Sequence, residues 1–143
     1  MKDLHNVVRT AVAIPPVAIG ATGTGQVGKI IDTAGYGGVE FLIAYGTITA
    51  TNAVFTVVLK EGDATGAMVS VADGDMLGTE LLAGVAATTP RTSGVSKNVT
   101  KRLGYKGAKR YVQLSISSTI TAATPISVVA LLHSPAIAPT ANP

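Results

Sequence analysis

The chain has 143 residues and a formal net charge of +3, yet only 13% of its residues are charged, against a usual share of about a quarter. It contains no cysteine, which excludes disulfides, thiolate metal sites and cysteine nucleophiles. Histidine occurs only at His5 and His133, which excludes an imidazole-rich metal centre. The length is typical of one domain, and we expect a single domain over residues 1–143.

No apolar stretch reaches the roughly 18 residues that a membrane-spanning helix needs. The apolar run of residues 11–21 is broken by Pro15 and Pro16 and follows charged residues, so it lacks the form of a signal peptide. We therefore expect a soluble protein that stays, or assembles, where it is made, without contact to a membrane.

Alternating apolar and polar residues predict strands along most of the chain. In order, these runs are residues 4–12, 26–32, 39–45, 55–60, 68–71, 97–103, 111–117 and 125–133. Clusters of Gly, Asp, Asn and Pro separate them, as turns require. About eight short strands without intervening helices indicate an all-β fold, an antiparallel β-sandwich or jelly roll with extended termini.

Three of these runs show which face is buried. The inward residues are expected to be Val39, Phe41, Ile43 and Tyr45, then Phe55, Val57 and Leu59, and then Val112, Leu114 and Ile116. The run over residues 125–132 is apolar on both faces, so it is either central in a sheet or covered by a partner subunit.

A helical pattern occurs only over residues 75–87, where Leu77, Leu81 and Val85 recur four residues apart and Asp75 is placed to cap the start. Gly78 and Gly84 weaken this pattern, so a short helix and a loop both remain open. At the ends we expect an N-terminal arm with the first strand over residues 1–20, interrupted by the two prolines. A proline-rich tail over residues 134–143 is expected to extend without local contacts.

The segment Gly23-Thr24-Gly25-Gln26-Val27-Gly28 fits the dinucleotide-binding fingerprint letter for letter. That site requires a helix directly after the glycines, whose N-terminus meets the pyrophosphate. Residues 29–35 are strand-like and too short for a crossover helix, and no acid lies about 20 residues further on. We interpret the motif as a glycine-rich turn that opens a strand, and we expect no cofactor.

Five acidic residues gather in one part of the sequence and are candidate ligands for a hard cation: Glu61, Asp63, Asp73, Asp75 and Glu80. They lack the loop spacing of an EF-hand, and acids in turns have an ordinary structural cause. We favour solvated turns and expect no metal. Because no nucleophile has a base beside it in the sequence, we expect that the protein is not an enzyme and binds no small-molecule substrate.

The charges are divided along the chain. Residues 1–80 carry four basic and eight acidic residues, whereas residues 81–143 carry seven basic residues, all within 91–110, and no acid. Residues 101–111 indicate strand, turn and strand, so we predict a hairpin over 97–110 with a basic tip that grips an acidic protein surface. A solvated basic face and a phosphate contact remain as alternatives. The candidate contact residues are Lys97, Lys101, Arg102, Tyr105, Lys106, Lys109 and Arg110.

Three segments carry a resemblance to a known family: residues 35–41 (GYGGVEF), 71–78 (VADGDMLG) and above all 103–112 (LGYKGAKRYV). They resemble small proteins from the head-gene clusters of tailed bacteriophages. In particular, the chain is similar over about residues 3–135 to the cement or decoration proteins that bind outside an HK97-type capsid. That family has no catalytic residues to transfer.

The resemblance implies a jelly roll on the outer capsid surface of a virion, made in the host cytoplasm, with the major capsid protein as its partner. It implies a homo-oligomer, a dimer more than a trimer, that bridges capsomers and resists the pressure of packaged DNA. Other virion parts remain as alternatives: a head–tail connector, a tail component or a host-glycan-binding sandwich. A nucleic-acid-binding β protein that uses residues 91–110 is a further alternative, although too few aromatic residues accompany the basic ones for stacking.

Overall fold

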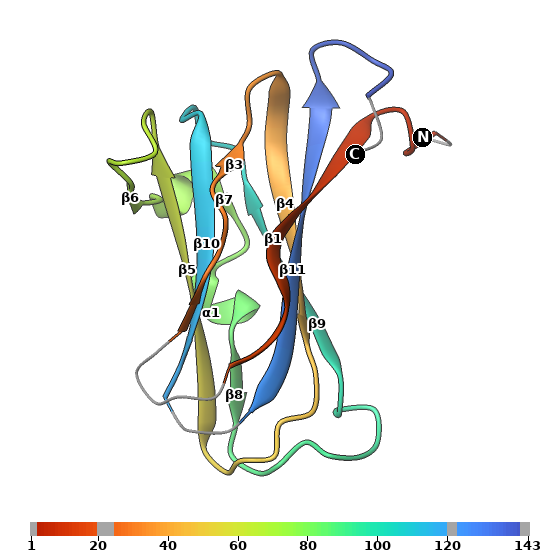
Figure 1. Ribbon diagram of the computed structural model, residues 1–143, viewed down its shortest axis with the longest axis vertical. Coiled ribbons are helices and arrows are strands. Elements are labelled where there is room, and N and C mark those ends of the chain that lie inside the picture. The colour runs from red at the N-terminus through yellow and green to blue at the C-terminus, as the bar shows by residue number, and fades with distance from the viewer. Residues whose placement is uncertain (1–2, 20–24, 120–122, 141–143) are drawn as a thin grey trace.

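Two antiparallel β-sheets face each other and form a sandwich (Figure 1). The computed structural model describes residues 3–19, 25–119 and 123–140. The elements of these residues, in chain order, are β1 (Val8–Ile19), β2 (Gly25–Val27), β3 (Ile31–Asp32), β4 (Tyr36–Tyr45), β5 (Ala53–Gly62), β6 (Val69–Ser70), the 3₁₀ turn η1 (Asp73–Asp75), β7 (Met76–Leu77), α1 (Glu80–Ala83), β8 (Val85–Ala87), β9 (Val99–Tyr105), β10 (Tyr111–Ser118) and β11 (Thr124–Pro135).

The order of the strands mixes distant parts of the sequence. Sheet A has the order β1-β11-β4-β9-β7, so the last strand lies between the first strand and β4. Sheet B has the order β2-β10-β5-β6, with β3 also pairing with β10 and β8 with β5. The pairings are antiparallel. The predicted all-β sandwich of jelly-roll type is confirmed.

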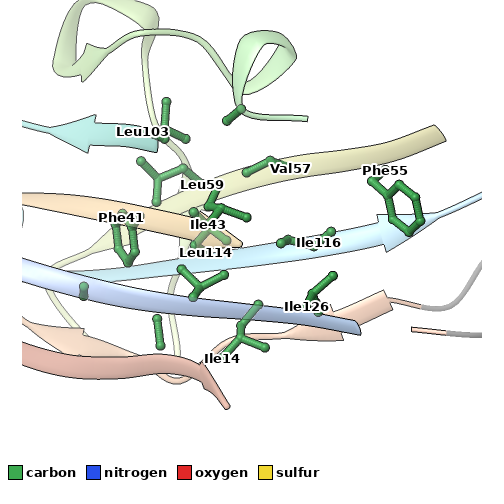
Figure 2. Packing of buried hydrophobic residues seen from close by; sticks show 14 of the residues in the cluster. Ile14, Phe41, Ile43, Phe55, Val57, Leu59, Leu103, Leu114, Ile116 and Ile126 are labelled. Atoms are coloured by element: carbon green, nitrogen blue, oxygen red, sulfur yellow. The ribbon is translucent and has the colours of Figure 1, made fainter. Parts of the chain in front are cut away.

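The core lies between the sheets and is made by the residues that the alternation predicted to face inward. Phe41 and Ile43 of β4, Leu59 of β5, and Leu114 and Ile116 of β10 are fully buried. Figure 2 shows these side chains pointing toward one another from both sheets. Burial of a large aliphatic or aromatic side chain contributes about 1.5–3 kcal/mol, so this double layer is the main source of stability.

The first strand differs from its prediction, because β1 continues through Pro15 and Pro16. Its register against β11 shifts between Val12 and Ile14, and again between Ile14 and Val17. Both prolines are exposed, and β1 is an edge strand with a pairing partner on one side. An edge strand tolerates prolines at bulges because it needs fewer backbone donors than a central strand.

The segment over residues 75–87 contains a single short helix turn, α1. Thr79 caps it, with its hydroxyl oxygen accepting the Leu82 N–H at 3.1 Å, whereas Asp75 belongs to the preceding 3₁₀ turn. Leu81 is 87% exposed while Val85 is buried, so the apolar residues that recur four apart do not lie on one face of a helix. The predicted strand over 26–32 also differs, since β2 and β3 are separate and both pair with β10.

β11 explains the run that is apolar on both faces. It is central in sheet A, and Ile126, Val128 and Leu132 are buried in the core. Val129 and Leu131 alternate with them and lie half-buried on the outer face. Burial in the core therefore explains why the inward face of β11 is apolar. Its outward face is also apolar but only half-buried, so it remains open to a partner.

The described part of the tail folds back onto the N-terminal segment. Ala136 donates its N–H to the Gly35 carbonyl at 2.8 Å, and Thr140 donates its N–H to the Asn6 carbonyl at 3.0 Å. The Thr140 hydroxyl also donates to the Val8 carbonyl at 2.8 Å. The tail up to residue 140 thus has the local contacts that the sequence did not predict. The remainder of the predicted arm and tail, residues 1–2, 20 and 141–143, lies outside the described residues.

Candidate functional site

The basic segment does not form a hairpin. β9 pairs with β4 and β7 in sheet A, whereas β10 pairs with β2, β3 and β5 in sheet B. The predicted hairpin over residues 97–110 is therefore wrong, and residues 106–110 cross from one sheet to the other. The physical reason is long-range pairing: β9 matches β4 over seven residues and β10 matches β5 over eight.

Tyr105 is buried, which corrects its prediction as a surface contact. Its hydroxyl donates to Glu61 Oε2 at 2.5 Å and accepts the Lys109 N–H at 2.9 Å. Burial, followed by the bond to Glu61, raises the pKa of the Tyr105 hydroxyl. A side chain at Gly107 would collide with the Tyr105 ring at 2.6–2.7 Å, so this glycine lets the crossing pass over the ring. The Gly-Tyr-Lys-Gly motif therefore joins the sheets.

Three of the candidate basic residues have acidic partners within the chain: Arg102 forms a long pair with Glu40, and Lys109 and Arg110 form close ones. Lys109 binds Asp63 through its Nζ, and Arg110 binds Asp32 through two hydrogen bonds of 3.0 and 2.8 Å. The Arg110 hydrogen bonds lower the pKa of Asp32. The hydrogen bond to Asp63 raises the pKa of Lys109, and the hydrogen bond to Asp32 raises that of Arg110. Part of the positive charge of this half is thus neutralised by acids of the other half.

Three lysines, which we call the β9 lysines, lack such a partner. They are Lys97 before the strand, Lys101 within it and Lys106 after it, and none has an ion pair among the described residues. Lys97 and Lys106 are exposed, and Lys101 is half-buried at the edge of sheet A. Lys97 and Lys106 thus flank β9, which at about 3.3 Å per residue is roughly 20 Å long.

Glu40 lies on the outer face of sheet A in an unusual environment. Its side chain is 24% exposed, and its one ion pair within the described part of the chain, to Arg102 Nε, is long at 3.9 Å. The carboxylate lies over Gly104, where an added Cβ would meet Glu40 Oε2 at 2.5 Å and the Leu77 Cβ at 2.8 Å. Burial raises the pKa of Glu40, against the weaker opposing effect of Arg102. A carboxylate so placed is poorly satisfied within the monomer.

A groove of about 640 Å³ surrounds this carboxylate. It is lined by Leu42, Leu77, Leu82, Glu40, Lys101 and Arg102. The alternation that turns Phe41 and Ile43 inward leaves Glu40 and Leu42 on the outer face of β4. An aliphatic residue such as Leu42 at an outward position of an alternating strand is the sequence signal that could have indicated this groove.

Two further candidate sites from the sequence are the acidic cluster and the glycine-rich fingerprint. Among residues 3–19, 25–119 and 123–140, no three histidine, aspartate or glutamate side chains come together as a metal site. Gly25 and Gly28 of the fingerprint lie against β10, where added Cβ atoms would meet the Ile116 and Leu114 carbonyls at 2.3 and 2.2 Å. These glycines therefore allow close strand approach, while residues 23 and 24 lie outside the described part. Within that part, no helix has the length and apolar character to cross a membrane.

No protein-family model matches the chain, and no curated protein matches it in sequence. Solved structures do match. The VP2 subviral particle of infectious bursal disease virus has a TM-score of 0.56 and 9% identity over 90% of this chain and 32% of that chain. The structure of the Gx strain of the same virus has a TM-score of 0.51 and 11% identity over 88% and 32%.

Another match covers most of this chain and nearly all of the other one. The carbohydrate-binding module CBM6cm-2 from Cellvibrio mixtus lichenase 5A has a TM-score of 0.41 and 11% identity over 90% of this chain and 98% of that chain. In contrast, this chain spans about a third of the two viral chains. At such identities the likeness shows the fold alone, which is a jelly-roll β-sandwich.

Proposed function

We propose that the chain is a virion structural protein that binds the outer surface of a tailed-phage capsid. In this role it contacts the major capsid protein, bridges neighbouring capsomers and stabilises the head against internal DNA pressure. The resemblance of residues 35–41, 71–78 and 103–112 to decoration proteins supports this role. The jelly-roll sandwich, a fold shared with the virus structures described above, is compatible with it.

The observation that carries the proposal is the row of β9 lysines. Lys109 and Arg110, at the end of the same basic segment, are bound to acids of this chain. Lys97, Lys101 and Lys106 have no ion pair among the described residues, so their charge is available to an acidic neighbour. Lys101 lies within β9 (Val99–Tyr105), Lys97 lies two residues before this strand and Lys106 directly after it, so the three lysines follow one strand of the sandwich.

Each lysine contact to an acidic surface is weak, because an exposed ion pair contributes about 0.2–1 kcal/mol. Many copies on one shell make such contacts effective, since linked copies bind with a high effective concentration. Lys101 also has a role within the monomer. It lies in the part of β9 that has no pairing with β7, since β7 pairs only with Gly104 and Tyr105, and a charge there discourages the addition of a foreign strand.

The test measures binding to purified heads that were assembled without this protein by the virus that encodes it. K97E/K106E is compared with the control K29E/K60E, which makes the same change in net charge at exposed lysines away from β9. Reversing two contacts removes about 2 kcal/mol of attraction, so we expect roughly thirtyfold weaker co-sedimentation for K97E/K106E at moderate salt. The K29E/K60E variant should bind as the wild type does.

Equal binding of both variants and the wild type would remove the β9 lysines from the shell contact. Duplex DNA is tested in parallel, because the nucleic-acid alternative depends on the same charges. Binding to DNA that is weakened by K97E/K106E, together with no binding to heads, would replace the proposal by that alternative. Its affinity should then fall steeply with salt, with a slope of about −0.9 per phosphate contacted.

A further inference from the structure

The outer face of sheet A is hollowed where β7 ends. β7 pairs with β9 only at Tyr105 and Gly104, so within the described chain residues 99–103 of β9 have no strand on that side. Gly78 follows β7 with a φ of +90°, which glycine adopts most easily, and the chain turns there toward α1. The groove of about 640 Å³ opens at this point. We call it the Glu40 groove, and its lining includes Glu40, Leu42, Leu77, Leu82, Lys101 and Arg102.

Three leucines from separate elements meet in the Glu40 groove. They are Leu42 of β4, Leu77 of β7 and Leu82 of α1, and their exposed fractions are 37%, 47% and 66%. Single apolar residues are common on protein surfaces and need no explanation. Three that line one hollow form a concave apolar site, which is the usual form of a binding site. The groove therefore offers a place for an apolar side chain of another molecule.

The helix turn that supplies Leu82 is fixed to both sheets. Glu80 Oε1 accepts the Leu59 N–H of β5 at 2.6 Å, and the Ala83 carbonyl accepts the Tyr45 hydroxyl of β4 at 3.0 Å. Ala83 is fully buried beneath the turn. This wall of the Glu40 groove is therefore preformed, and a preformed site loses little conformational entropy when it binds.

Arg102 lies in the same groove with unused hydrogen-bond donors. Its side chain is 81% exposed, and its one ion pair within the described residues joins Nε to Glu40 Oε1 at 3.9 Å. Because Glu40 lies on the Nε side, the two Nη groups at the end of the guanidinium remain for an acceptor from outside. Their fork matches the two oxygens of a carboxylate. Lys101 beside it has no ion pair among the described residues and adds to the positive charge.

We infer that the Glu40 groove holds an extended acidic segment of the shell protein, with an apolar side chain between its three leucines and a neighbouring carboxylate on the Arg102 guanidinium. This inference rests on the proposed function, because it names the part of the partner that the surface beside β9 recognises. Charge complementarity selects an acidic segment, since Lys101 and Arg102 outnumber Glu40 in the groove. The β9 lysines attract the acidic surface, and the groove makes the specific contact.

The first test measures co-sedimentation with the same purified heads, assembled without this protein. L82S removes one wall of the groove. L81S is its matched control, because Leu81 is the adjacent residue of α1, is 87% exposed and does not line the groove. R102Q removes the guanidinium, and R9Q removes one charge from β1, at the opposite edge of sheet A.

We expect L82S and R102Q each to bind at least about tenfold more weakly than the wild type, since one loses apolar contact and the other a charged donor. L81S and R9Q should bind as the wild type does. Thermal unfolding confirms that each variant is folded. If L82S does not fold, the comparison of R102Q with R9Q decides, because both side chains are exposed.

The second test needs no heads. The pentapeptide SELDS, blocked at both ends, carries an apolar side chain between two acidic ones. SQLNS keeps the apolar side chain without the charges, and SESDS keeps the charges without the apolar side chain. Methyl NMR spectra of the full chain should show SELDS shifting the signals of Leu42, Leu77 and Leu82, with a dissociation constant of about 1–10 mM. SQLNS and SESDS should bind at least about tenfold more weakly.

The outcomes separate this inference from the proposed function. If K97E/K106E weakens binding to heads while L82S or R102Q binds as the wild type does, the lysine contact stands and the groove contact is refuted. Equal weakening by L82S and L81S would also exclude the groove. If the wild type does not bind heads, the proposed function fails and the peptides decide alone. Preference for SELDS at the groove leucines then supports the acidic-segment site, whereas no shifts, or equal shifts with SESDS or SQLNS, would overturn it.

Discussion

Replacing Tyr105 with phenylalanine removes a single oxygen atom from the contact that joins β9 to β5. The hydroxyl donates to Glu61 at 2.5 Å and accepts the Lys109 N–H at 2.9 Å. Glu61 is 8% exposed, so water cannot freely replace the lost donor. A hydrogen bond to a charged group contributes about 1.5–3 kcal/mol, and an unsatisfied buried acceptor adds to its loss. We therefore expect Y105F to lower the free energy of unfolding by about 2–3 kcal/mol.

Urea unfolding followed by far-ultraviolet circular dichroism measures this loss, and the melting temperature should fall by roughly 5–10 °C. Tyr45→Phe is the matched control. Tyr45 is also buried, but its hydroxyl donates to the neutral Ala83 carbonyl at 3.0 Å, which contributes only about 1 kcal/mol. The reasoning is refuted if Y105F destabilises the protein no more than Y45F.

Three further predictions concern the same framework. Gly107→Ala places a carbon 2.6–2.7 Å from the Tyr105 ring and should cost about 1–3 kcal/mol in urea, whereas Gly66→Ala, in open space, should change stability by less than about 0.5. Burial raises the pKa of Tyr45 and Tyr105, so the folded chain keeps phenol protons that the unfolded chain releases above about pH 10. The urea midpoint should therefore fall as pH rises above about 10, less so in Y105F, and a flat profile would contradict this. Asp63→Asn removes an exposed pair with Lys109 and should cost under about 1 kcal/mol, with no effect left in about 1 M salt.

The inward faces of the strands could be predicted because they depend on local alternation. Phe41, Ile43, Leu59 and Leu114 are buried as expected, since a period of two places alternate residues on one face whatever the strand pairs with. The two prolines misled the prediction of β1 because their cost depends on whether a strand is at an edge. That property belongs to the sheet and is invisible in the segment itself.

The arrangement of β9 and β10 could not be predicted from their neighbourhood in sequence. A short connection of residues 106–110 is compatible with both a hairpin and a crossing between sheets. The choice depends on pairing with β4 and β5, more than 40 residues away along the chain. The acid partners of Lys109 and Arg110 are equally remote, so the sequence could not separate them from the β9 lysines. The alternation along β4 predicts that Glu40 faces outward. Its position over Gly104 could not be predicted, because it depends on the register between β4 and β9.

The role on the capsid surface is tested most directly by imaging virions of the encoding virus by electron cryo-microscopy, with and without this protein. The proposed function predicts added density of a β-sandwich outside the shell, in a fixed ratio to the major capsid protein, with β9 turned toward the shell. Particles with identical outer surfaces, or density confined to the tail, would contradict it.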